Sequence, residues 1–165
     1  MIKRILSTVS LALMASVIVL GQQPKWAKKA AKSVFTLKTF STDGSMLAST
    51  NGFFVTSDGV AVSNFSPFRG AVRAVAIDAD GKEWPVVSVM GANDMYDLVK
   101  FRVGVKKAAA LEAASNPASD GSVLWLLPYA AKKVPTCVSG TVDKAEKVSG
   151  DYTYYTLKMK SMKSN

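Results

Sequence analysis

The chain has 165 residues, of which 48% are hydrophobic and 20% charged, a composition typical of a globular protein rather than a disordered one. This length is enough for one ordinary domain with a substantial core, but not comfortably for two. The absence of histidine excludes a Ser-His-Asp catalytic triad, and the single cysteine, Cys137, excludes an intrachain disulfide. We also expect no metal site, no cofactor and no cysteine-protease dyad, and we expect Cys137 to be a small buried side chain.

The formal net charge is +9, and a basic chain of this kind can attract an anionic partner. The lysines, however, are spread in small groups along the chain. They lack the interleaved aromatic residues and the arginine-rich stripe of a nucleic-acid-binding surface. We therefore interpret them as solvated faces and expect no nucleic-acid partner.

The N-terminus has the pattern of a secretory signal peptide over residues 1–21. Lys3 and Arg4 precede a largely apolar run over 5–20, and Val19 and Gly21 are small enough for a cleavage site before Gln22. The alternative is a membrane anchor, but the run is shorter than the roughly 20 residues that span a bilayer. We expect cleavage, export to the periplasm or the medium, and no stable membrane span afterwards. Cleavage would remove two basic residues and leave 19 basic and 12 acidic ones, a formal charge of +7.

After a short basic helix expected over 25–33, the apolar pattern has the period of strands. Short alternating runs are separated by turns such as Thr42-Asp43-Gly44-Ser45, Ser57-Asp58-Gly59 and Asp78-Ala79-Asp80-Gly81. Strands are expected over 34–40, 52–56, 60–63, 72–77, 83–90 and 98–103, and in a second cluster over 123–127, 134–142 and 152–159. Many short strands at this spacing predict an all-β sandwich or barrel.

The run from Gly52 to Asn64, GFFVTSDGVAVSN, resembles the trypsin-like domain of the HtrA/Deg serine proteases. In that family a Gly-Phe strand, an Asp-Gly hairpin and a Thr-Asn or Ser-Asn step lead to the catalytic histidine. In this chain the histidine position falls on Ser66, or on Phe65 if the register slips by one. Gly70-Ala71 then resembles the Gly-Ala that follows the histidine in the family.

Later segments resemble the same family in the same order. The run over 80–86 is similar to its Asp-Gly-x-Glu hairpin, and the run over 93–101 is similar to the segment that carries the catalytic aspartate, here Asp97. Segments over 121–128 and 139–142 resemble the opening strands of a second barrel. The resemblance implies a trypsin-like double β-barrel, with the N-terminal helix and a complete first barrel over 22–105, a linker over 106–118 and a partial second barrel over 119–165.

The departures from the family pattern concern the catalytic residues. A triad needs a base whose pKa lies near neutrality, and neither Ser66 nor Phe65 can supply one. Asp97 then has no imidazole to orient, and its alternative interpretation is a carboxylate that stabilises a turn. No Gly-x-Ser-x-Gly elbow is present, and a Ser-Lys dyad is disfavoured because the lysines lie in exposed-looking clusters.

The family's nucleophile lies in a Gly-x-Ser-Gly loop after the strand that resembles 152–159. We expect that loop to begin at about Asn165, where the sequence stops. Two interpretations follow: a fragment of a longer serine-protease-like protein, which we favour, or a short protein whose open strand edge is filled by another chain.

These patterns predict an exported, catalytically inactive protease homologue, a pseudoprotease, that binds a peptide or a protein by strand pairing. One alternative is a basic envelope protein that binds polyanions through its lysines. Another is an active hydrolase that uses an unusual base and residues beyond Asn165. The identity of the partner and the oligomeric state are left open.

Overall fold

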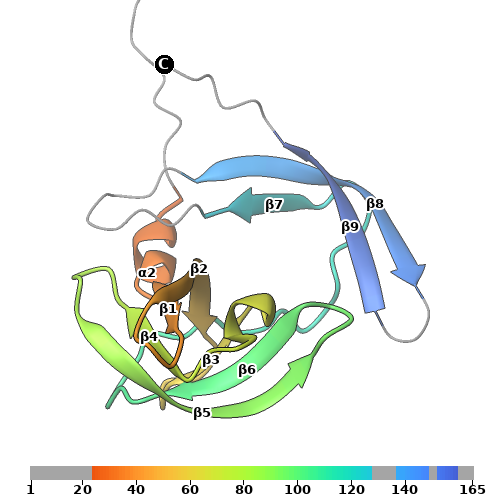
Figure 1. Cartoon of the computed structure of the whole chain (residues 1–165). Helices are drawn as coiled ribbons and strands as arrows, with labels where there is room; N and C mark the ends of the chain where they lie inside the picture. The colour runs from red at the N-terminus through yellow and green to blue at the C-terminus, as the bar shows by residue number, and fades with distance from the viewer. Residues whose placement is uncertain (1–23, 128–136, 149–151, 160–165) are drawn as a thin grey trace, which may run out of the picture.

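The computed structural model describes residues 24–127, 137–148 and 152–159 (Figure 1). The expected signal peptide, residues 1–21, lies outside this range. In chain order the elements are α2 (Ala27–Ala31), β1 (Val34–Phe40), β2 (Met46–Phe54), β3 (Val60–Ser63), the 3-10 helix η2 (Ser66–Phe68), β4 (Arg73–Ile77), β5 (Glu83–Asn93), β6 (Leu98–Val103), β7 (Val123–Leu126), β8 (Val138–Val148) and β9 (Tyr152–Met159). The prediction of an all-β fold with a short N-terminal helix is confirmed.

Strands β1 to β6 form a closed antiparallel barrel in the order β1-β2-β3-β6-β5-β4. Alternate residues of β1 point into it, so that Phe35, Leu37 and Thr39 are fully buried. The ring of Phe35 lies 4.7 Å from that of Phe54. Burial of each large apolar side chain contributes about 1.5–3 kcal/mol, so this interior supplies most of the stability of the barrel. The core residues are Phe35, Leu37, Phe54, Ala61, Ala74, Ala76, Val99, Phe101 and Val103.

The Ser57-Asp58-Gly59 turn, predicted from its residue types, joins β2 to β3 and also holds β3 against β6. Gly59 has a φ of 94°, and a Cβ at this position would lie 2.5 Å from the carbonyl oxygen of Val103. Glycine is therefore the residue that fits. The carbonyl of Gly59 accepts a hydrogen bond from the backbone N–H of Val103 at 2.9 Å, and Arg102 forms an ion pair with Asp58 at 2.9 Å.

Strand β2 is longer than predicted, because the sequence indicated only 52–56 and the strand begins at Met46. Its first half carries polar residues and exposed apolar ones, which conceals the two-residue period. Pairing with the whole of β1, from Val34↔Phe53 to Phe40↔Met46, extends it. The connecting turn is held by Asp43, whose carboxylate accepts hydrogen bonds from the Ser41 hydroxyl and from the Ser45 backbone N–H, the latter at 2.9 Å. These bonds, that of Ser41 above all, lower the pKa of Asp43 to about 2.

The segment expected to be a linker, 106–118, is bound to the barrel over its first half. The backbone N–H of Ala108 donates to the carbonyl of Ser57 at 2.9 Å, and that of Leu111 donates to the carbonyl of Phe54 at 2.8 Å. Val105, Ala108 and Ala110 pack against the core. The first half of this segment therefore lies against the barrel.

Strands β7, β8 and β9 form a separate antiparallel sheet in that order, which Figure 1 shows above the barrel. Strand β8 extends to Val148 instead of stopping at 142, and the expected start of this strand at 134–136 lies outside the described residues.

The predicted burial of Cys137 is confirmed, and burial raises the pKa of its thiol. Trp125 of the sheet contacts Trp26, the residue just before α2, at 6.1 Å between ring centroids. Tyr154 of the sheet contacts Tyr96, in the turn between β5 and β6 of the barrel, at 6.4 Å. Over the described ranges, no helix is long and apolar enough to cross a bilayer.

The barrel interior buries a hydroxyl group whose removal should stabilise the protein. The hydroxyl of Thr39 is fully buried and has no hydrogen-bond partner among the described residues. An unsatisfied buried hydroxyl costs about 1–3 kcal/mol, so Thr39→Val, which replaces it with a methyl group, is expected to raise the free energy of unfolding by about 1 kcal/mol in urea titrations. The matched control is Thr36→Val on the half-buried outer face of β1, for which we expect little change. A destabilised Thr39→Val protein would show that the hydroxyl is satisfied.

Candidate functional site

Ser66 and Asp97, the two residues that the sequence placed at triad positions, lie in contact although they are far apart in the chain. The backbone N–H of Ser66 donates to Oδ1 of Asp97 at 2.5 Å, and its hydroxyl donates to Oδ2 at 3.0 Å. The side-chain amide of Asn64 donates to the same Oδ2 at 3.0 Å. A single carboxylate therefore holds both the backbone and the side chain at position 66.

The barrel brings the two residues together through the pairing of β3 with β6. Their register places Ser63, the last residue of β3, opposite Val99, near the start of β6. The residues that follow Ser63 and those that precede Leu98 must then emerge side by side at the same end of the barrel. The backbone N–H of Phe65 also donates to the carbonyl of Asp97 at 3.1 Å, which continues the connection beyond the ladder.

Asp97 occupies a left-handed backbone conformation, with a φ of 50°. Aspartate is one of the few residues other than glycine that adopts this region readily. The preceding turn supports it, because the backbone N–H of Asp97 donates to the carbonyl of Asp94 at 3.3 Å and the backbone N–H of Tyr96 donates to the side-chain oxygen of Asn93 at 3.1 Å. An ion pair between Arg69 and Asp94 links this turn to the chain after η2.

The hydrogen bonds keep Asp97 ionised. The backbone N–H of Ser66 is the main cause that holds the pKa of Asp97 below its ordinary value, and the side chains of Asn64 and Ser66 lower it further, although partial desolvation opposes them. A carboxylate with a lowered pKa is a weak proton acceptor at neutral pH. The site can therefore bind and orient hydrogen-bond donors, but it contains no group suited to accept a proton from a nucleophile and return it.

Phe65, the other residue weighed for the histidine position, does not reach Asp97 with its side chain. Its ring is partly buried against the barrel core, and the guanidinium of Arg69 lies 5.7 Å from the ring centroid. Of the two candidates, Ser66 is the one whose side chain meets the aspartate. The alternative interpretation of Asp97 as a turn carboxylate also fits this geometry, because the same hydrogen bonds stabilise the loop.

Sequence reasoning missed Asn64 as a member of the site. It belongs to the Ser-Asn step that carries the family resemblance, and its place just before the position assigned to the family's histidine was the available signal. Within the described ranges, no group of three or more histidine, cysteine, aspartate or glutamate side chains could hold a metal ion.

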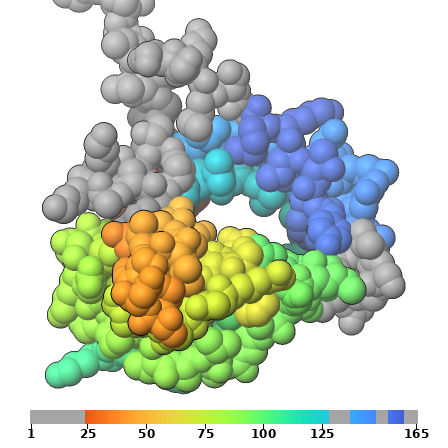
Figure 2. Space-filling model, viewed as in Figure 1, coloured from red at the N-terminus to blue at the C-terminus, as the bar shows by residue number. Residues whose placement is uncertain are grey.

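The site lies near the second sheet. Tyr96, the neighbour of Asp97, contacts Tyr154 of β9, and Figure 2 shows a hollow between the barrel and the sheet. Comparison with protein-family models and with curated proteins finds no match for this chain.

The lowered pKa of Asp97 predicts a pH-dependent contribution to stability. A group whose pKa is lower in the folded state stabilises above its unfolded value, about 3.9 for aspartate, and loses this effect as the pH falls through the folded value. Asp97→Asn should therefore lower the Tm at neutral pH, and the deficit should shrink in acid below the ordinary aspartate pKa. The control is Asp80→Asn in the exposed turn before β5, which we expect to change Tm little. An Asp97→Asn deficit that is equal at neutral and acid pH would contradict this role.

Proposed function

We propose that the chain is an exported, periplasmic or secreted homologue of the HtrA/Deg trypsin-like proteases that lacks catalysis and acts by binding a peptide or protein. The observation that carries the proposal is the contact between Ser66 and Asp97. In a working triad the aspartate accepts a hydrogen bond from the histidine and orients it. Here Asp97 accepts that bond from the Ser66 hydroxyl, at the position where the family motif has the histidine.

The fold supports the family assignment at a coarse level. A closed six-stranded antiparallel barrel followed by a three-stranded sheet is the arrangement expected of a trypsin-like double barrel whose second half is partial. The two triad positions lie at one end of the first barrel, near β9 of the second sheet. That the barrel and the sheet together form a trypsin-like double barrel is part of the proposal.

Loss of catalysis follows from the chemistry of the site. Ser66 has no group that titrates near neutrality, and Asp97 is held ionised. A Ser-Lys dyad needs a buried lysine, but the lysines among the described residues are exposed, apart from the half-buried Lys38. The hydrogen bonds to the Asp97 carboxylate then fix the loop and do not transfer protons.

Peptide binding is supported by strand edges that lack a neighbour. Among the described strands, β7 and β9 are each paired on one side only, and β5 has no second partner beyond Pro85. Unpaired edges present backbone N–H and C=O groups that an extended segment can satisfy. Recognition of this kind depends on the backbone and on apolar side chains more than on charge.

One experiment separates binding, hydrolysis and polyanion recognition. A pool of fluorescein-labelled random octapeptides of zero net charge is mixed with the protein, and the anisotropy is followed over time at about 50 mM and about 500 mM NaCl. We expect a rise that is stable in time and changes less than about twofold in Kd between the two salt concentrations, because strand pairing neutralises no phosphate or sulfate charges.

Two outcomes would contradict the proposal. Anisotropy that decays with time, and no longer decays with Asp97→Ala, would reveal an active hydrolase. Absence of peptide binding, together with binding of labelled heparin that weakens by orders of magnitude at the higher salt, would favour a polyanion-binding protein.

A further inference from the structure

The barrel is not uniformly paired, because β4 and β5 separate partway along their length. Their ladder consists of Val75↔Pro85, Ala76↔Trp84 and Ile77↔Glu83. Beyond Pro85, strand β5 continues to Asn93 with β6 as its partner, whereas residues 72–74 stay beside β1. We call the resulting opening, bounded by residues 72–74 and 86–89, the β4–β5 seam.

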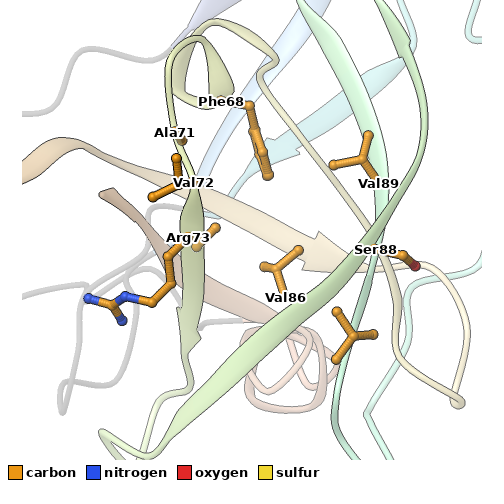
Figure 3. A pocket seen from close by; sticks show the side chains of 9 residues that line it. Phe68, Ala71, Val72, Arg73, Val86, Ser88 and Val89 are labelled. Carbon is orange, nitrogen blue, oxygen red and sulfur yellow. The ribbon is translucent and has the colours of Figure 1, made fainter. Parts of the chain in front are cut away.

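The seam contains a hollow of about 160 Å³, and most of the residues that line it are apolar. This is several times the roughly 30 Å³ that one water molecule occupies in the liquid, and it gives room for a branched aliphatic side chain. Figure 3 shows Phe68 and Val86 pointing into the hollow, while Arg73 turns away from it. Its lining residues are Phe68, Ala71, Val72, Arg73, Ala74, Val86, Val87, Ser88 and Val89.

The β5 side of the seam is an exposed apolar edge. Val87 and Val89 are 57% and 54% exposed, and the ladder with β6 is irregular between Val86 and Ser88 and between Val89 and Gly91. Exposed apolar edges of this kind recruit additional strands. The edge therefore offers backbone groups for pairing next to a hollow that one apolar side chain could fill.

The positive charge of Arg73 indicates which side chains an added strand would carry on its outward face. The guanidinium of Arg73 lies 3.8 Å from the centroid of the Phe40 ring, which fixes its position, and none of the described ion pairs includes it. A guanidinium held in this way binds a carboxylate well. Successive side chains of a strand point to opposite faces, so a segment with an apolar residue in the hollow presents its neighbour on the Arg73 face.

We infer that the β4–β5 seam binds an extended segment of a partner polypeptide in which apolar and acidic residues alternate. The inference rests on the proposed peptide-binding function and identifies the edge and the class of ligand. The partner's carboxylate complements Arg73 and the formal charge of +7 of the exported chain, which opposes pairing with a second copy of this chain. The edges of β7 and β9 are weaker candidates for this binding site. They adjoin the ranges 128–136 and 160–165, which lie outside the described residues.

The test uses the peptide Thr-Val-Glu-Val-Thr-amide, labelled with fluorescein on its N-terminal amine, and measures its Kd by anisotropy. A glutamate at position 87 places a negative charge on the edge beside an acidic ligand, so Val87→Glu should weaken binding by about tenfold or more, equivalent to at least about 1.4 kcal/mol. The matched control is Val123→Glu, the same change at a 61% exposed valine of the second sheet, which should keep Kd within about twofold.

Arg73→Gln should weaken binding of the same peptide by about threefold, and a probe with glutamine in place of glutamate should lose this dependence. Equal affinity of wild-type, Val87→Glu and Arg73→Gln proteins would overturn the seam, as would no binding of the probe by the wild type. In either case the experiment with the random peptide pool would still test the proposed peptide-binding function independently of the seam. A wild-type dimer that Val87→Glu converts to a monomer in sedimentation would assign the seam to a second copy and also overturn the inference.

Discussion

The pairing of β3 with β6 is the constraint on which the rest of the structure depends. It closes the barrel between two hairpin systems that are distant in the chain, and it requires Gly59 at the turn where β3 approaches Val103. The same register brings the residues after Ser63 beside those before Leu98. The candidate site is therefore a consequence of barrel closure, because the pairing of β3 with β6 positions the Asp97 carboxylate.

Asp97 illustrates how a residue can serve structure where the family motif predicts catalysis. Its carboxylate accepts two hydrogen bonds from Ser66 and one from Asn64, and these ionic hydrogen bonds fix the loop that leads into η2. In the proposed assignment Ser66 stands at the histidine position and keeps this role, because its hydroxyl still donates to the carboxylate. It cannot keep the proton transfer, because its hydroxyl does not titrate near neutrality. The proposed shift from catalysis to binding is thus compatible with an intact first barrel, and the β4–β5 seam is the binding edge that we propose for that barrel.

Much of the barrel could be predicted from the sequence because its signals are local. The strand over 34–40 alternates apolar and polar residues, and the Asp-Gly turns at 58–59 and 80–81 mark hairpins. The first half of β2 could not be predicted, since Ser49, Thr50 and Asn51 conceal its period and only pairing with β1 extends it. Neither the docking of 106–111 on the barrel nor the separation of β4 from β5 has a local signal, because both depend on contacts between distant segments. The meeting of Ser66 and Asp97 was accessible only through the family resemblance, and Asn64 was overlooked even so.

The most direct test of the account is the pKa of an imidazole introduced by Ser66→His, followed by NMR. The chain contains no other histidine, so the signal is unambiguous. If position 66 corresponds to the triad base, the Asp97 carboxylate will raise the imidazole pKa above its ordinary value of about 6.5, and adding Asp97→Asn will remove the increase. An imidazole pKa at or below the ordinary value that does not respond to Asp97→Asn would contradict the account, because position 66 would then not be the place of a lost catalytic base.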